Sequence, residues 1–215
     1  MGLIEEISEF LQKGRSKKVK ELVQKAMDEN MDPKVILNEG LLSGMMIVGA
    51  KFKNNEVFVP EVLVSARAMN AGLAILEPKL VEAGNEPVGR AVIGTVQGDL
   101  HDIGKNLVGM MFKGAGFEVC DMGVDVGADA FIDKAEEIGA DVIGMSALLS
   151  TTMPQMQECI RRLEERGLRE KYIVMIGGAP VTDDFAKEIG ADYYTPDAAS
   201  AAETARNAVV ERKSA

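Results

Sequence analysis

The hydrophobic pattern of this chain changes once, near residue 83, and the change divides the sequence into two parts of different fold class. Before it, apolar residues recur at three- and four-residue spacing, which is typical of amphipathic helices. After it, short apolar runs alternate with longer amphipathic stretches, which is typical of alternating strands and helices. We therefore predict an N-terminal helical domain over residues 1–83, a linker over residues 84–89 and an α/β domain over residues 90–215.

Four helices are predicted in the first part. The apolar spacing places them near residues 3–11, 19–27, 33–48 and 60–76. Asp32-Pro33 and Pro60 support two of the helix starts, because aspartate caps a helix N-terminus and proline fits its first turn. Helices joined by short connections are expected to pack as a small bundle.

Five strands are predicted in the second part, with helices between them. The strands cover residues 91–96, 117–122, 141–146, 172–178 and 191–195, and a last helix covers residues 198–212. Successive strand–helix units imply a parallel sheet covered by helices on both faces. We expect a flavodoxin-like, Rossmann-like fold, in which ligands bind beyond the carboxyl ends of the strands where the strand order reverses. That reversal lies between the first and third strands.

The segment after the first predicted strand, GTVQGDLHDIGKN (residues 94–106), contains the only histidine of the chain, His101. Asp99 lies two positions earlier, so in extended backbone both side chains project to the same side. A carboxylate that accepts one ring N–H leaves the other imidazole nitrogen free, as in the usual support of a metal-ligating histidine. One histidine is one ligand, whereas a protein-built zinc site needs three or four. A metal at His101 would therefore need most of its ligands from a cofactor such as a tetrapyrrole.

Other interpretations of this segment are less favoured or stay open. A phosphate-binding loop is disfavoured, because five residues instead of four separate Gly98 from Gly104, and Asn106 follows Lys105 where Ser or Thr is needed. A hydrolase is disfavoured because no Ser or Cys nucleophile motif accompanies the histidine. A purely structural loop, with Asp102 as the N-cap of the next helix, stays open on these residues alone.

Several segments resemble the signature of cobalamin-binding proteins. DLHDIG (residues 99–104) matches their D-x-H-x-x-G motif, SAL (residues 146–148) is similar to their S-x-L element, and Gly177-Gly178 to their downstream glycine pair. The segment of residues 58–78 resembles the cap helix of cobalamin-dependent methionine synthase and of the corrinoid proteins of methyltransferase systems. The resemblance covers nearly the whole chain, and it implies a free-standing corrinoid protein with a helical cap.

The resemblance also implies a cofactor and its ligands. Cobalamin, as methylcobalamin or hydroxocobalamin, would bind base-off and His-on, with His101 as the lower axial ligand of cobalt. Asp99 would orient His101, and Thr152 would complete this relay with a hydroxyl where methionine synthases have serine. The implied cofactor-binding residues are Gly98, Asp99, Leu100, His101, Asp102, Gly104, Ser146, Leu148, Ser150, Gly177 and Gly178, with Phe52 and Val59 over the upper corrin face.

The implied function is methyl transfer, in which the cobalt alternates between Co(I) and methyl-Co(III). The protein would be a non-catalytic carrier subunit rather than a complete enzyme. It would serve a substrate-specific methyltransferase, a second methyltransferase with a folate, pterin or thiol acceptor, and a reductive activation protein. Two alternatives stay open: a cobalamin-responsive regulator, and the cobalamin subunit of a radical mutase.

Composition argues against several other function classes. The net charge of −10, the absence of tryptophan and the 5% aromatic content disfavour nucleic-acid binding. The acidic start, MGLIEEISEF, is unlike a signal peptide, and we expect no apolar run long enough to span a membrane. The two cysteines, Cys120 and Cys159, form no spaced framework. We therefore expect a cytoplasmic protein without nucleic-acid or membrane partners.

Overall fold

The computed structural model describes residues 2–82 and 86–214, and the chain forms two compact units, residues 1–86 and 87–215. The predicted domain limit at residue 83 and the first residues of the predicted linker, 84 and 85, lie outside the described residues. Each unit has its own buried apolar core.

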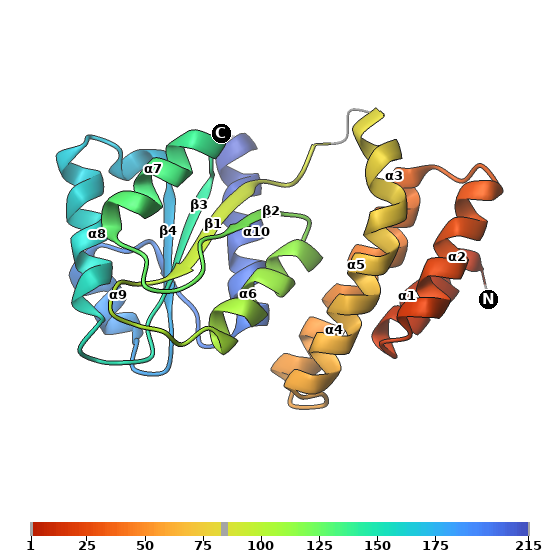
Figure 1. Cartoon of the computed structure of the whole chain (residues 1–215), viewed down its shortest axis with the longest axis horizontal. Helices are drawn as coiled ribbons and strands as arrows, with labels where there is room; N and C mark the ends of the chain where they lie inside the picture. Colours follow the sequence, from red (N-terminus) through yellow and green to blue (C-terminus); the bar gives the residue numbers. More distant parts are fainter. Residues whose placement is uncertain (1, 83–85, 215) are drawn as a thin grey trace. The chain divides into compact units, whose positions relative to one another are not determined.

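The first unit is built from helices (Figure 1). Its segments are α1 (Leu3–Gln12), α2 (Ser16–Asp28), α3 (Pro33–Val35), the π-helix η1 (Ile36–Leu42), α4 (Ser43–Lys53) and α5 (Val59–Glu82). Apolar side chains at helical spacing, among them Ile7, Val23 and Met69, are fully buried. The helical first part predicted from the sequence is thus confirmed, and α5 begins one residue before Pro60.

The third predicted helix, near residues 33–48, is longer and less regular than expected. Segments α3, η1 and α4 follow one another without a break as far as Lys53, and the middle segment is π-helical. Gly40 brings this helix close to α1, since a Cβ at that position would lie 3.1 Å from Cγ2 of Ile7. Apolar spacing alone does not distinguish a π-helical turn from an α-helical one, so this turn could not be predicted from the sequence.

Two helices of this unit have the length and hydropathy of a membrane span, contrary to the expectation from the sequence. They are Pro33–Lys53 and Val59–Leu80, with mean hydropathies of 1.4 and 1.3. Within the protein, 50% of the first apolar window and 39% of the second are buried. The expectation was wrong by this criterion, which the core helices of soluble proteins also satisfy.

The second unit, over the described residues 87–214, contains a parallel sheet of five strands. They are β1 (Arg90–Thr95), β2 (Glu118–Asp121), β3 (Val142–Ser146), β4 (Ile173–Gly177) and β5 (Tyr193–Tyr194). The strand order β2-β1-β3-β4-β5 confirms the predicted flavodoxin-like arrangement. In this register Thr95 pairs with Ser146, and Ser146 with Gly177, so the loops after β1, β3 and β4 leave the sheet at one level.

Helices cover both faces of this sheet (Figure 1). They are α6 (Ile103–Gly114), α7 (Ala128–Ile138), α8 (Pro154–Glu165), α9 (Asp183–Ile189) and α10 (Ala198–Ser214), with a short 3-10 helix, η2 (Arg169–Lys171). Helices α6 and α10 pack together on one face, and α7, α8 and α9 lie on the other. Buried side chains such as Val92, Ile143 and Phe131 fill the second interface.

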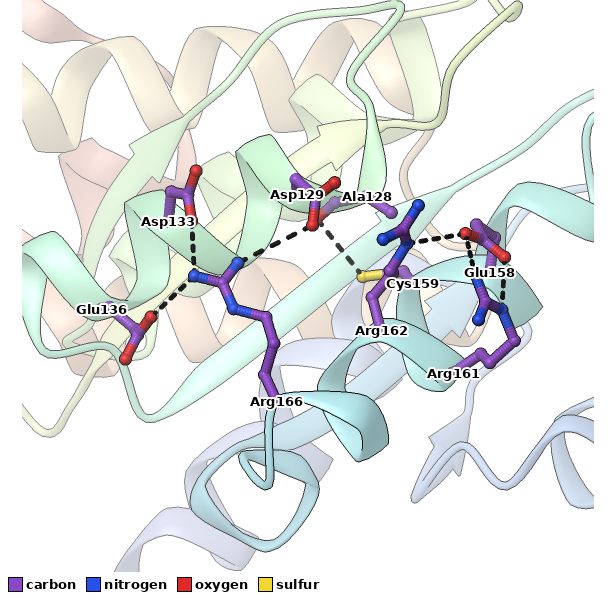
Figure 2. Close-up of polar contacts among 9 residues, drawn as sticks. All are labelled: Ala128, Asp129, Asp133, Glu136, Glu158, Cys159, Arg161, Arg162 and Arg166. Carbon is purple, nitrogen blue, oxygen red and sulfur yellow. Dashed lines mark hydrogen bonds and ion pairs between the residues drawn. The ribbon is translucent and has the colours of Figure 1, made fainter.

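The outer surfaces of α7 and α8 carry a network of ion pairs (Figure 2). Arg166 contacts Asp133 at 2.7 Å and Glu136 at 3.1 Å. Hydrogen bonds from Arg161 and Arg162 lower the pKa of Glu158 to about 2. These pairs are exposed to solvent, so each stabilises the fold only weakly. They lie on helices that cover the sheet, and none of them involves a residue that the sequence analysis assigned to the site.

Candidate functional site

The loops that follow β1 and β3 meet at the carboxylate of Asp99. Its Oδ2 accepts hydrogen bonds from the backbone N–H of Leu148 at 2.8 Å and of Leu149 at 3.2 Å. The hydroxyl of Thr152 donates to the same oxygen at 2.9 Å. The strand order causes this meeting, because β1 and β3 are neighbours in the sheet although α6, β2 and α7 separate them in the sequence.

The other carboxylate oxygen of Asp99 holds His101. Its Oδ1 lies 2.7 Å from Nδ1 of the imidazole and accepts the backbone N–H of His101 at 3.1 Å. Asp99 is fully buried, whereas 51% of the His101 side chain is exposed. The structure therefore brings Asp99, His101 and Thr152 together, as the sequence analysis expected of a relay.

The hydrogen bonds at Asp99 determine its charge state. Burial acts to raise the pKa of this carboxyl, but the hydrogen bonds from Leu148, His101 and Thr152 outweigh burial and hold the pKa well below its ordinary value. Asp99 is therefore an ionised acceptor at neutral pH, and the contact at Nδ1 requires that this nitrogen of His101 carries the proton. In the neutral imidazole, Nε2 then keeps its lone pair and is the nitrogen available to a ligand.

Backbone contacts from a third loop fix the segment around Asp99. The N–H of Gly98 donates to Oδ1 of Asp125 at 2.7 Å, and the N–H of Asp125 donates to the carbonyl of Asp99 at 3.0 Å. Thr95, the last residue of β1, is fully buried and donates from its hydroxyl to the carbonyl of His101 at 2.7 Å. Neither Thr95 nor Asp125 was among the site residues predicted from the sequence. A polar residue that closes an apolar strand is the only signal that could have indicated Thr95.

Large apolar side chains are exposed on the loop that carries Asp99 and His101 and on the loop after β3 that contacts Asp99. Leu100 is 72% exposed and Ile103 is 75% exposed on the first loop and the start of α6. Leu148 and Leu149 are 44% and 41% exposed on the loop after β3. Exposed apolar groups clustered beside a polar group are typical of a ligand-binding surface. Leu149 and Ile103 were not among the predicted cofactor-binding residues.

The described residues, 2–82 and 86–214, contain no group of three or more His, Cys, Asp or Glu side chains that could hold a metal ion. His101 alone offers an imidazole. The donor set therefore fits a metal that brings its other ligands with it, and the exposed leucines fit a flat apolar macrocycle around that metal.

The glycines and serines of the predicted site have different structural surroundings. Gly178 has φ of +131°, and a Cβ there would lie 1.8 Å from the carbonyl oxygen of Ala147, so the fold itself requires glycine. A Cβ at Gly104 would meet nothing within 4 Å. Ser150 is exposed, and Ser146 ends β3 beside Gly177.

The remaining predicted residues lie elsewhere or act differently. Asp102 stands at the N-cap of α6, but its side chain makes no capping bond and instead accepts a hydrogen bond from the Asn106 side chain at 3.1 Å. Phe52 on α4 and Val59 at the start of α5 belong to the helical unit, and both are half-buried there.

Two domain families match the chain, and they divide it as the two compact units do. A B12 binding domain family matches residues 89–205, and a second B12 binding domain family matches residues 3–77. The fold and the site thus define a B12-binding protein.

Relatives of known class cover almost the whole chain. A corrinoid protein of Desulfitobacterium hafniense (strain Y51) is 46% identical over 208 residues, which are 95% of this chain and 96% of that protein. Dimethylamine corrinoid protein 3 of Methanosarcina acetivorans is 43% identical over 205 residues, with the same coverage of both chains. The chain belongs to the family of corrinoid proteins of methyltransferase systems.

Solved structures agree with this assignment. A chain of the methanol:cobalamin methyltransferase complex of Methanosarcina barkeri superposes with a TM-score of 0.86 at 29% identity, covering 97% of this chain and 80% of that chain. A cobalamin-binding protein of Desulfitobacterium hafniense superposes with a TM-score of 0.79 at 29% identity, covering 95% of this chain and 97% of that chain.

Proposed function

We propose that this corrinoid protein is a methyl carrier that binds its cofactor base-off, with His101 as the lower axial ligand of cobalt. The observation that carries the proposal is the state of His101. Its ring is half exposed, and its Nδ1 is held by the buried, ionised Asp99. Exposed leucines lie on its own loop and on the loop after β3. An isolated imidazole with a free Nε2 is suited to be a single axial donor.

The residues of the relay have separate tasks in this proposal. His101 offers Nε2 to the metal, and Asp99 keeps the ring in the required tautomer and orientation. Thr152 and the loop after β3 keep Asp99 ionised and fixed. When bound, the corrinoid supplies a cobalt centre that accepts a methyl group and passes it on. Because Asp99 holds a proton poorly, we expect the relay to keep its proton at Nδ1 of His101.

The rest of the predicted cofactor site extends this arrangement. We propose that the nucleotide tail of the cofactor passes Gly98, Ser146, Ser150, Gly177 and Gly178. Ser146 and Gly177 are paired at the carboxyl ends of β3 and β4, and this position supports the proposed path. We further propose that Asp102, Gly104, Leu100 and Leu148 border the lower corrin face, and that Phe52 and Val59 of the cap cover the upper face.

The partners follow from the carrier role. One solved relative is part of a methanol:cobalamin methyltransferase complex, and others are named as dimethylamine corrinoid proteins. We propose that this protein meets a substrate-specific methyltransferase, a second methyltransferase with a folate, pterin or thiol acceptor, and a reductive activation protein. It would act in the cytoplasm as a carrier subunit, not as a complete enzyme. These relatives favour a carrier over a regulator or a mutase subunit.

An absorption spectrum tests the axial ligand. The protein is mixed with hydroxocobalamin and passed through a gel-filtration column, alongside His101→Ala and the control Lys113→Met, which changes an exposed residue at the end of α6. We expect wild type and control to retain corrinoid with a base-off, His-on spectrum, and His101→Ala to lose that spectral signature. A His-on spectrum that persists in His101→Ala would exclude the axial role, and failure of wild type to retain any corrinoid would contradict the proposed function itself.

A further inference from the structure

A buried lysine lies beside the His101 segment, and the proposed chemistry does not use it. Lys105 is in the first turn of α6, and only 4% of its side chain is exposed. Its Nζ donates to both carboxylate oxygens of Asp121, at 2.5 and 2.6 Å, and to Oδ1 of Asn106 at 2.6 Å. Lysine is rarely buried, and a cation near a helix N-terminus opposes the helix dipole. Helix formation and core packing therefore do not explain this residue.

On one side, Lys105 is linked to the loop that supports Asp99. Asp121 is the last residue of β2, and its Oδ1 also accepts the backbone N–H of Gly123 at 2.8 Å. The carbonyl of Gly123 accepts the N–H of Thr95 at 3.0 Å. Two residues further on, Asp125 contacts the backbone on both sides of the peptide that joins Gly98 to Asp99.

On the other side, Lys105 is linked to the residue that follows His101. Asn106 accepts from Lys105 through Oδ1 and donates through its side-chain amide to Asp102. The Lys105 ammonium group therefore connects the end of β2, whose loop supports Asp99, with the Asp102 side chain that follows His101. These contacts are independent of those that Leu148, Leu149 and Thr152 make with Asp99.

We propose that Lys105, through its ion pair with Asp121, is a positioning residue that sets the orientation of His101. Its significance for cobalt ligation rests on the proposed function, whereas its effect on the imidazole does not. Without Lys105 the protein should fold, but His101 should lose its fixed orientation against Asp99. A merely structural ion pair would change stability and leave the ring unaffected.

The first experiment uses the cofactor-free protein. Because the chain has one histidine, nuclear magnetic resonance of protein labelled with ¹⁵N-histidine gives a single imidazole spin system. In wild type and in the control Lys113→Met, we expect a protected Nδ1–H signal, since Asp99 accepts that proton. In Lys105→Met we expect this proton to exchange with water at least about tenfold faster. An unchanged signal in folded Lys105→Met overturns the proposal.

A second variant covers the case in which Lys105→Met does not fold. Lys105→Met/Asp121→Leu replaces the whole pair with apolar residues, which leaves no unpaired charge. We expect this double variant to fold and to show the same fast exchange, because the link between the two segments is still missing. A protected Nδ1–H in the double variant would overturn the positioning role.

The last experiment separates this proposal from the proposed function. With saturating hydroxocobalamin, Lys105→Met should retain corrinoid, but its ratio of His-on to His-off forms should fall by about tenfold, the lower end of effects seen for groups that support metal ligands. A ratio equal to that of wild type overturns the positioning of the ligand. If wild type itself binds no corrinoid, the proposed function fails, and the exchange measurement still decides whether Lys105 positions His101.

Discussion

At the scale of single residues, one carboxylate organises the site. Asp99 is fully buried and accepts hydrogen bonds from His101, from Thr152 and from the backbone of Leu148 and Leu149. A buried charge is tolerated only when such donors surround it. The donors come from two loops, so Asp99 links the loop after β1 to the loop after β3. Substitutions in this set should therefore affect both stability and the state of His101.

Thr152 offers a matched pair of substitutions. Its hydroxyl donates to Asp99 at 2.9 Å and lies 2.8 Å from the carbonyl of Leu149. We expect Thr152→Val, which keeps the shape and removes the hydroxyl, to lower the free energy of unfolding by about 1 kcal/mol. Thr152→Ser should stay close to wild type. Urea denaturation measures both, and equal stability of Thr152→Val and Thr152→Ser would show that the hydroxyl does not support Asp99.

Cys159 gives a prediction for the dependence on pH. Burial first, and then the negative charges of Asp129 and Glu158, raise the pKa of its thiol to about 12. The folded protein therefore keeps this proton at a pH where the unfolded chain, with a thiol pKa of about 8.5, loses it. The buried, protonated thiol contributes fully to stability below a pH of about 8.5, the pKa in the unfolded chain. This contribution declines as the pH rises towards the folded pKa of about 12.

Thiol labelling at pH 8 checks this state. A disulfide reagent should modify Cys120, which is half-buried, and leave Cys159 unmodified until urea unfolds the protein. Cys159→Ala removes this thiol, so its urea midpoint should fall less than that of wild type as the pH rises above about 8.5. Equal labelling rates of both cysteines in folded protein would contradict the burial of Cys159.

At the scale of elements, the sequence predicted the helices, the strands and their order, because apolar spacing and turn residues encode them locally. It also predicted that Asp99, His101 and Thr152 come together, through a family motif and the expected strand order. It did not predict the π-helix η1 or the supporting contacts of Lys105 and Asp125. Asp125 lies on the loop after β2, and Lys105 on α6 contacts Asp121 at the end of β2. No periodicity indicates such contacts between segments.

The loop after β4 gives a prediction at this scale. Gly178 has a left-handed φ of +131° and lies against the backbone of Ala147, so Gly178→Ala should lower the free energy of unfolding by about 2 kcal/mol or more. Gly104 lies in the first turn of α6 with open space at its Cβ position, and Gly104→Ala should stabilise the protein by about 0.5–1 kcal/mol. The unfolding temperatures of Gly178→Ala and Gly104→Ala, each compared with that of wild type, test both expectations. If Gly178→Ala unfolds at the wild-type temperature, that loop has relaxed and the close approach is not required.

At the scale of the whole molecule, the two units correspond to the two domain families, over residues 3–77 and 89–205. Each unit has a hydrophobic period of its own in the sequence, and each period requires its own kind of core. The relay around Asp99 and the loops that support it lie entirely in the second unit.

This organisation predicts that residues 87–215 fold without the helical unit. We expect the fragment to unfold cooperatively in urea and to show the same protected imidazole signal of His101 as the full chain. Circular dichroism and histidine-labelled resonance spectra measure the two properties. A fragment that lacks a cooperative transition would show that the second unit depends on the first.

The hydrogen bonds at Asp99, which join the loop after β1 to the loop after β3, also affect how such a protein can evolve. The loop after β1 supplies the acceptor, and the loop after β3 supplies Leu148, Leu149 and Thr152 as donors. A change that shifts one loop leaves donors or the carboxylate of the other unpaired, so the two loops are not free to diverge separately. We expect lineages that alter one of them to carry a compensating change in the other, and a loop transplanted alone from a distant relative to be selected against.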